Sequence, residues 1–153
     1  MIARSALLTV IAAGLSFGAE AFVGTWKPNP DKWKDSPGAP ENRKSNLFKL
    51  EAITNGHYRQ TQFSPDGKRA GPTVDLFLDG KEHPVGDGDM ATVRRVSDMH
   101  ISISVKGPKG VTTMEYMLSA DGRALTVTRG GVGTKSGRPI DEVHEYTKGR
   151  VEV

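Results

Sequence analysis

The residues best suited to chemistry in this chain are polar side chains within segments that favour strands. His144 and Tyr146 are two positions apart, so in a strand their side chains point to the same side. If that side faces an enclosed interior, the imidazole and the phenol could hydrogen-bond a polar group of a small molecule. The alternative is that both residues lie on a wet outer face. The spacing alone leaves the two alternatives open.

A second group of candidates lies earlier in the chain. Arg94 and Arg95 are neighbours in a strand-like segment and so point to opposite faces. An inward guanidinium is costly unless it is paired or meets an anionic ligand. Tyr116 shares a face with Met114 and Leu118, and the alternation predicts that this face is buried. The candidate ligand-binding residues are therefore His144, Tyr146, Arg95 and Tyr116.

The sequence contains no recognisable metal or catalytic motif. Its histidines lack the H-x-H or H-E-x-x-H spacing of metal ligands, and they are predicted to be scattered over the surface. There is no Gly-x-Ser-x-Gly, and the acidic segment 75–89 lacks the full calcium-loop pattern. We therefore predict no catalytic residue, no metal and no cofactor. The four histidines are His57, His83, His100 and His144.

Composition narrows the class of protein. The 153 residues are enough for one domain with a core, and the formal net charge is +3. The basic residues are scattered and form no stripe interleaved with aromatics, which argues against a nucleic-acid-binding surface. The chain has no cysteine, which excludes disulfides, zinc–thiolate sites and a lipid-modified cysteine.

The first 21 residues have the three parts of a secretory signal peptide. Arg4 supplies the positive start, residues 6–17 form an apolar run, and Ala19-Glu20-Ala21 fits the small-x-small cleavage pattern. The run is too short to span a bilayer, and no later segment is apolar enough to do so as a helix. We expect cleavage near Ala21, a mature domain of residues 22–153 in the periplasm or outside the cell, and no stable membrane insertion.

The mature chain reads as short strands separated by turn signals. Asn-Gly and Asp-Gly pairs favour hairpin turns, and their spacing predicts a meander of antiparallel strands that closes into a barrel. Two segments interrupt this pattern: residues 27–44, with four prolines, and residues 81–89 are predicted to be irregular loops. The predicted strands are 22–27, 46–53, 57–63, 73–78, 91–96, 100–105, 111–118, 124–129 and 140–147.

A resemblance to a known family rests on several short motifs in order. The segment Gly24-Thr25-Trp26-Lys27 resembles the first strand of lipocalins and fatty-acid-binding proteins, the calycin superfamily. With the motifs at 63–68, 79–85 and 119–128, the chain resembles bacterial exported lipocalin-like proteins of no established function. The resemblance implies a single up-and-down barrel of about 8–10 strands. It places Gly24 and Trp26 at the closed end, with Arg129 or Arg150 packed over the indole.

The same resemblance bears on function. Fatty-acid-binding proteins hold a ligand carboxylate with an Arg-x-Tyr pair on the last strand, and this chain has His144 in place of the arginine. The chain also lacks the sequence of a helical lid. We therefore expect an extracytoplasmic protein that binds a small apolar or amphipathic molecule. A barrel enzyme of isomerase or hydrolase type, or a filled barrel acting as a structural or interaction module, remains the alternative.

Overall fold

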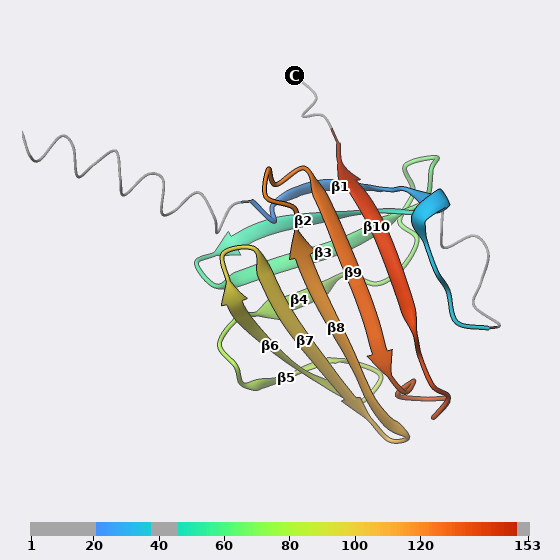
Figure 1. Cartoon of the computed structure of the whole chain (residues 1–153). Helices are drawn as coiled ribbons and strands as arrows, with labels where there is room; N and C mark the ends of the chain where they lie inside the picture. Colours follow the sequence, from blue (N-terminus) through green and yellow to red (C-terminus); the bar gives the residue numbers. More distant parts are fainter. Residues whose placement is uncertain (1–20, 38–45, 150–153) are drawn as a thin grey trace, which may run out of the picture.

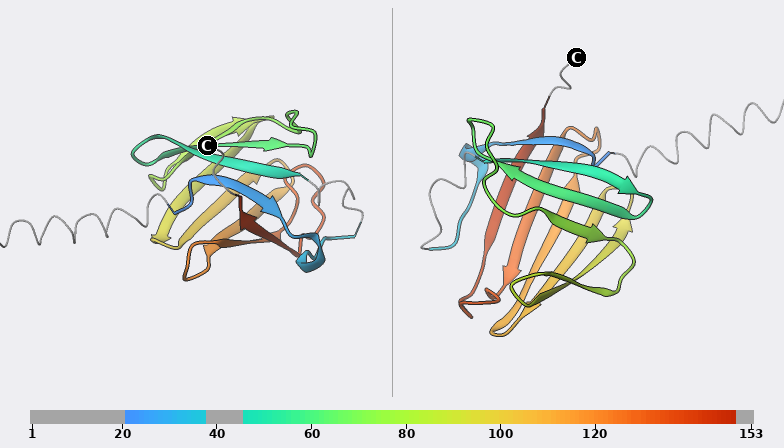
Figure 2. Two further views of the ribbon diagram at one scale, coloured as in Figure 1. Left: turned by 90° about the horizontal axis from the view of Figure 1, so that it is seen from above. Right: turned by 180° about the vertical axis from the view of Figure 1, so that it is seen from behind.

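The computed structural model describes residues 21–37 and 46–149, and these form a nearly closed antiparallel β-barrel. Its single sheet has ten strands in the order β4-β3-β2-β1-β10-β9-β8-β7-β6-β5, so every neighbouring pair except β1 and β10 is consecutive in the chain. In Figure 1 the strands β1–β4 cross behind β6–β10 at a steep angle, and the view from behind in Figure 2 shows them in front, so the barrel has two layers. The predicted all-β, up-and-down architecture is confirmed.

The strands are β1 (Gly24–Pro28), β2 (Leu47–Thr54), β3 (His57–Phe63), β4 (Val74–Phe77), β5 (Glu82–Gly86), β6 (Asp89–Ser97), β7 (His100–Gly107), β8 (Gly110–Leu118), β9 (Ala124–Gly131) and β10 (Glu142–Lys148). A single 3-10 turn, η1 (Pro30–Lys32), follows β1. Each of the nine predicted strands overlaps one of these.

The strand β5 is the one that sequence reasoning missed, because Pro84 and two glycines had marked residues 81–89 as an irregular loop. That prediction is wrong for residues 82–86. Proline cannot donate to a strand ladder, but it is tolerated on an edge strand, and β5 is the last strand of the sheet. The other predicted loop, 27–44, begins inside β1 and contains η1, and its residues 38–44 lie outside the described part.

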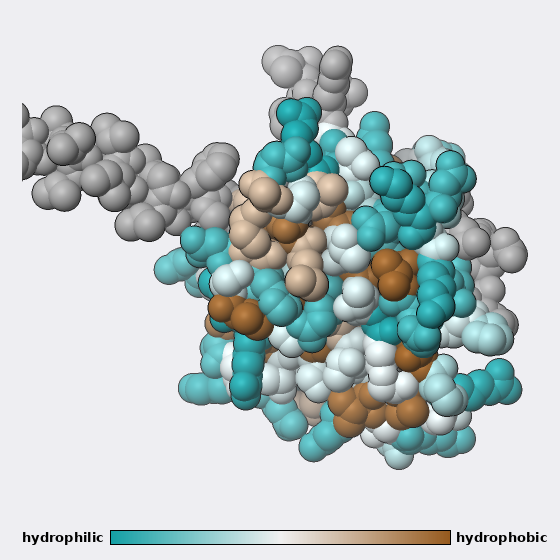
Figure 3. All heavy atoms as spheres, viewed as in Figure 1, coloured by the Kyte–Doolittle hydropathy of each residue, from teal (hydrophilic) through white to brown (hydrophobic). Residues whose placement is uncertain are grey.

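Alternation along the strands builds the core. Ile101 and Ile103 on β7, and Leu125 on β9, are at most 2 % exposed, and the residues between them point outward. The register places Ile101 opposite Tyr116 and Tyr116 opposite Val127, so buried side chains line up across neighbouring strands. Figure 3 shows the outer face of this layer, where hydrophobic residues form separate small groups among hydrophilic ones.

The barrel is incomplete between β4 and β5, which share no strand pairing. An aromatic stack spans this gap: the Phe77 ring stacks on His57 of β3 and on His83 of β5, with ring centroids 4.2 and 4.5 Å apart. Each imidazole also contacts a carboxylate, Asp75 for His57 and Asp79 for His83. Side chains therefore replace the missing backbone ladder at this edge.

Gly24 and Trp26 lie on β1, and we call their end of the barrel the closed end. Trp26 is fully buried, and its indole N–H donates to the Phe22 carbonyl at 2.9 Å. Gly24 has a φ of +143°, and a Cβ there would lie 2.9 Å from Lys148 Cε. Glycine at this position therefore leaves room for the Lys148 side chain.

The cation over the Trp26 indole is Lys148, whose Nζ lies 5.3 Å from the ring centroid. The expectation of Arg129 there is wrong, because that residue sits five positions along β9 from its closed-end residue Ala124 and pairs with Glu142 instead. Arg150 lies outside the described residues, as do residues 1–20 of the predicted signal peptide. Burial lowers the pKa of the Lys148 ammonium. Within the described part of the chain, no helix is long and apolar enough to cross a bilayer.

Candidate functional site

A cavity of about 260 Å³ lies inside the barrel, toward the end opposite Trp26, which we call the open end. Its walls combine aromatic and aliphatic side chains with amide, guanidinium and imidazole groups. It is lined by Asn46, Leu47, Phe48, Gln60, Gln62, Met114, Tyr116, Val127, Arg129, His144 and Tyr146. An apolar cavity with a few converging polar groups is the usual form of a small-molecule site.

His144 and Tyr146 both face this interior. They are 6 % and 8 % exposed, and the β9–β10 register sets them opposite the inward residues Val127 and Leu125. The alternative of a wet outer face is therefore excluded. The expectation that the histidines lie on the surface is wrong for His144, since the even-numbered residues of β10 all point into the barrel.

The segment that follows η1 covers His144. The Trp33 ring stacks on the imidazole with centroids 4.1 Å apart and 9° between the planes, and its N–H donates to the Glu145 carbonyl. Lys34 forms a two-way backbone bridge with Val143, with both N···O distances 2.8 Å. This part of the loop is therefore an ordered strap along β10, in the place where the sequence predicted only an irregular segment.

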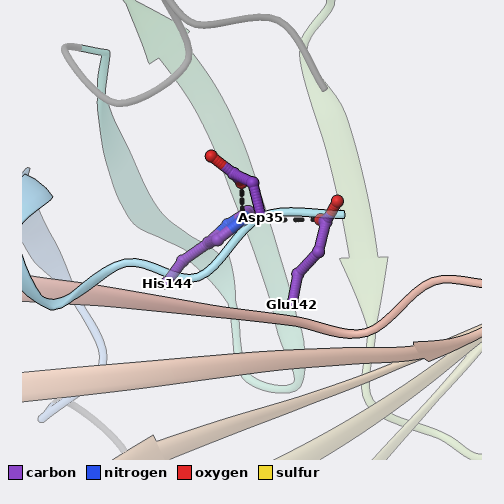
Figure 4. Close-up of side chains that lie close together, drawn as sticks. All are labelled: Asp35, Glu142 and His144. Atoms are coloured by element: carbon purple, nitrogen blue, oxygen red, sulfur yellow. Dashed lines mark hydrogen bonds and ion pairs between the residues drawn. The ribbon is translucent and has the colours of Figure 1, made fainter. Parts of the chain in front are cut away.

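Three titratable side chains meet at the strap (Figure 4). Asp35 belongs to the loop, Glu142 and His144 project from β10, and His144 Nε2 lies 3.2 Å from Asp35 Oδ1 and 3.4 Å from Glu142 Oε1. Within the described ranges this is the one group with the composition and proximity of a metal-binding set. Its chemistry fits an ion-pair network better, because Arg129 Nη1 already donates to Glu142 Oε1 at 2.8 Å.

The Glu142 carboxylate is held on both oxygens. Oε1 accepts from Arg129, and Oε2 accepts the Ser36 backbone N–H at 3.2 Å. The Glu142 side chain is 4 % exposed and that of Arg129 is 25 % exposed, so the acid of this pair is largely removed from water while its partner is only partly buried. The guanidinium that faces the cavity thus carries its own counter-ion.

A second, almost wholly apolar compartment of about 180 Å³ adjoins the first. Val74 and Leu76 of β4 and Val85 of β5 line it, so it lies behind the β4–β5 gap. The two compartments share three lining residues, Gln60, Met114 and Tyr116, which form the boundary between them.

The Tyr116 hydroxyl lies on this boundary and donates to Gln60 Oε1 at 2.8 Å. Burial raises the pKa of this phenol, and the hydrogen bond to Gln60 opposes that shift. Tyr116 is therefore a neutral hydrogen-bonding group at neutral pH. Met114 lies on the same boundary, and its unbranched side chain has three rotatable bonds.

Three of the four candidate residues thus share one site, and Arg95 does not belong to it. Arg95 lies on the inner face of β6, paired in register with the buried Ile101, but at the closed end. The structure therefore brings His144, Tyr146 and Tyr116 to one interior surface, which the sequence had left open for His144 and Tyr146, and it separates Arg95 from them.

Sequence reasoning missed Gln60, Arg129 and Glu142 as parts of the site. Strand parity carries a signal for the last two, since Arg129 shares a face with Leu125 and Val127, and Glu142 shares one with His144. Asp35 and Trp33 gave no such signal, because only the folded path of a long loop brings them to β10.

No family model matches the sequence, and no curated protein matches it either. Solved structures do match the fold. A mutant of the fluorescent protein UnaG is 15 % identical, with a TM-score of 0.61, over 86 % of this chain and 99 % of that one. The Schistosoma mansoni fatty acid binding protein in complex with arachidonic acid is 12 % identical, with a TM-score of 0.61, over 87 % and 99 % of the two chains.

A secretory abundant heat soluble protein from Ramazzottius varieornatus is 18 % identical, with a TM-score of 0.60, over 84 % of this chain and 96 % of that one. At these identities the likeness concerns the fold alone. The described barrel therefore has the calycin-type fold, with a strap of extended chain and one 3-10 turn between its first two strands.

Proposed function

We propose that this protein binds a small amphipathic molecule inside the barrel, with the polar head at the open end and the apolar tail behind the β4–β5 gap. The observation that carries the proposal is the pair of adjoining compartments, one lined by polar groups and one apolar. Neither reaches the 300–1,000 Å³ typical of ligand pockets alone, but together they do. The space fits a medium-length chain with a small head.

The polar compartment favours a head without negative charge. Arg129 is the guanidinium that lines it, and Glu142 already neutralises that charge at 2.8 Å. Asp35 adds a second carboxylate next to His144. A carboxylate head would enter close to two acids, whereas a hydroxyl or carbonyl head can use the amides of Gln60 and Gln62 and the ring groups of His144 and Tyr146. The ligand class is therefore an uncharged amphipath such as a medium-chain alcohol.

The fold supports the proposal as an analogy. The Schistosoma protein with a similar fold is in complex with arachidonic acid, an amphipath with a long apolar tail.

We also propose that the protein acts outside the cytoplasm, after cleavage near Ala21. The support is the three-part signal in residues 1–21. Cleavage at this point would also remove the Ala21 carbonyl, which accepts a hydrogen bond from Lys148 Nζ at 3.0 Å. Lys148 would then keep its contact with the Trp26 ring.

The test is isothermal titration of residues 22–153 with decanol, decanoate and decylamine at neutral pH. Burial of the ten-carbon tail at about 0.8 kcal/mol per carbon contributes about 8 kcal/mol, and the cost of association is subtracted from this value. Decanol should bind at one site and more tightly than decanoate. Tighter binding of decanoate would overturn the head-group assignment alone, and no binding of any of the three would overturn the function.

A further inference from the structure

Arg95 is an inward-pointing cation that the interior cavity does not use. Its Nη2 donates to the Tyr58 hydroxyl at 3.1 Å. Its Nη1 is buried and has no hydrogen-bond partner within the described ranges. None of the described carboxylates lies within ion-pair distance of it, although Arg59, Arg129 and four lysines each have such a partner.

This arrangement is costly for the protein alone. A guanidinium stays charged at any pH at which the protein folds, so it cannot relieve its burial by losing a proton. A buried donor without a partner also destabilises the fold. An anion that reached Nη1 would remove both penalties, and the site is thus incomplete without one.

A hollow of about 440 Å³ opens at the closed end, and Arg95 is one of its lining residues. Its walls are the Ala52 and Leu78 side chains and the Tyr58 ring, and Thr54 and Asn55 add polar groups beside the β2–β3 turn. Its lining has no residue in common with either interior compartment. The hollow is therefore a separate site.

Two strand irregularities border this hollow. The β2–β3 register shifts between Ala52 and Thr54, and the β6–β7 register shifts between Arg95 and Ser97. The residues within the shifts, Ile53 and Val96, are 41 % and 58 % exposed, whereas Ala52 and Arg95 line the hollow. Bulges redirect side chains and occur at barrel rims and beside binding sites. Both register shifts thus lie directly next to residues that line the hollow.

We propose that this hollow binds the carboxylate of a small organic acid, with Arg95 as its counter-ion. The planar fork of a guanidinium matches a carboxylate and holds it by charge-assisted hydrogen bonds. One cation matches one negative charge, and the apolar walls accommodate a hydrocarbon body, which inorganic phosphate lacks. The site is independent of the proposed amphipath cavity, and neither proposal needs the other.

The test uses benzoate as the probe and benzamide as its uncharged analogue of nearly the same shape. Titrations of residues 22–153 followed by NMR should show saturable benzoate binding, with shifts at Tyr58, Asn55 and Arg95. Benzamide and inorganic phosphate should bind at least about tenfold more weakly, as expected for the loss of a charge-assisted pair or of the apolar contact.

Two variants assign the effect to Arg95. R95M keeps the length of the apolar stem and should weaken benzoate binding by about tenfold or more, whereas R95K keeps the charge and should retain part of it. If R95M does not fold, R95K and the benzamide comparison decide. Absence of benzoate binding to the wild type, equal binding of benzamide, or unchanged binding in R95M would each overturn the proposal.

Discussion

At the scale of single residues, the site depends on which charges are already paired. Arg129 and Glu142 face each other across β9 and β10, and the carboxylate is also held by the Ser36 N–H. Because the two opposite charges lie in direct hydrogen-bond contact, the pair offers little net charge to a ligand. The selectivity for an uncharged head therefore rests on Glu142 more than on the residues that touch the head.

Replacing Glu142 by glutamine should reverse that selectivity. E142Q keeps the size of the side chain and an oxygen for the Ser36 N–H, but it leaves the Arg129 charge without its counter-ion. Decanoate affinity should rise by about 10- to 100-fold, the value of one charge-assisted hydrogen bond, while decanol affinity changes little. Titration of both ligands against both proteins measures this. Unchanged decanoate affinity in a folded E142Q would show that Glu142 does not set the head-group preference.

Some of these residues could be assigned from the sequence and others could not, and the difference has a physical cause. Parity along a strand needs only local information, so His144 and Tyr146 could be assigned to a common face, and Tyr116 to the face of Met114 and Leu118. Which face is inner depends on the whole sheet, and that choice stayed open for His144. Contacts across the strap, such as Trp33 on His144, depend on a loop path that no local pattern encodes.

At the scale of elements, the same turn design recurs in the β3–β4 and β8–β9 connections. In Ser119-Ala120-Asp121-Gly122 the Asp121 carboxylate accepts the Ser119 hydroxyl at 2.6 Å and the Arg123 N–H at 3.0 Å. Asp66 makes the corresponding contacts with Ser64 and the Lys68 N–H. These hydrogen bonds lower the pKa of both carboxyl groups, and in each case the hydrogen bond from the serine hydroxyl has the largest effect. The turns are therefore stabilised by ionised aspartates.

The hydrogen bonds to these aspartates make the stability of the fold depend on pH in the acid range. A carboxyl whose pKa is lower in the folded than in the unfolded protein stabilises fully above its unfolded value of about 3.9, and loses that contribution as pH falls through the lower folded value. D121N cannot titrate, so between about pH 4 and pH 2 it should lose less stability than the wild type. Urea unfolding midpoints at pH 7 and pH 3 measure the difference. An equal loss in both proteins would contradict the role of Asp121.

Element prediction succeeded where patterns were regular and failed at the edge of the sheet. The strand β3 was predicted to the residue, and β7 and β8 nearly so, because alternation and the Asp-Gly and Lys-Gly turns agree there. The strand β5 was not predicted, because a proline indicates the end of a strand when the neighbouring strands are unknown. Its place as the last strand, where a missing N–H costs little, follows only from the closed sheet.

At the scale of the whole molecule, the residues that plug the barrel and the compartments proposed to bind a ligand lie toward opposite ends. The closed end is plugged by Trp26 and Phe22, both fully buried, and the interior toward the open end holds the two compartments. The filled-barrel alternative therefore does not describe this interior. The β4–β5 gap lies beside the apolar compartment, so the tail of a ligand would sit against the least strongly paired edge of the sheet.

The most direct test of interior binding fills the apolar compartment and leaves the head site unchanged. Ala91 lines this compartment and is 4 % exposed, so A91M places its side chain where the tail would lie. The matched control is T113M, which adds a methionine at an exposed position of β8. The measurement is the decanol Kd of the wild type and both variants by isothermal titration.

A91M should weaken decanol binding by about 200-fold, the value of roughly four methylenes excluded from burial at about 0.8 kcal/mol each, while T113M should bind like the wild type. Equal decanol affinity in the wild type and in a folded A91M would contradict binding inside the barrel.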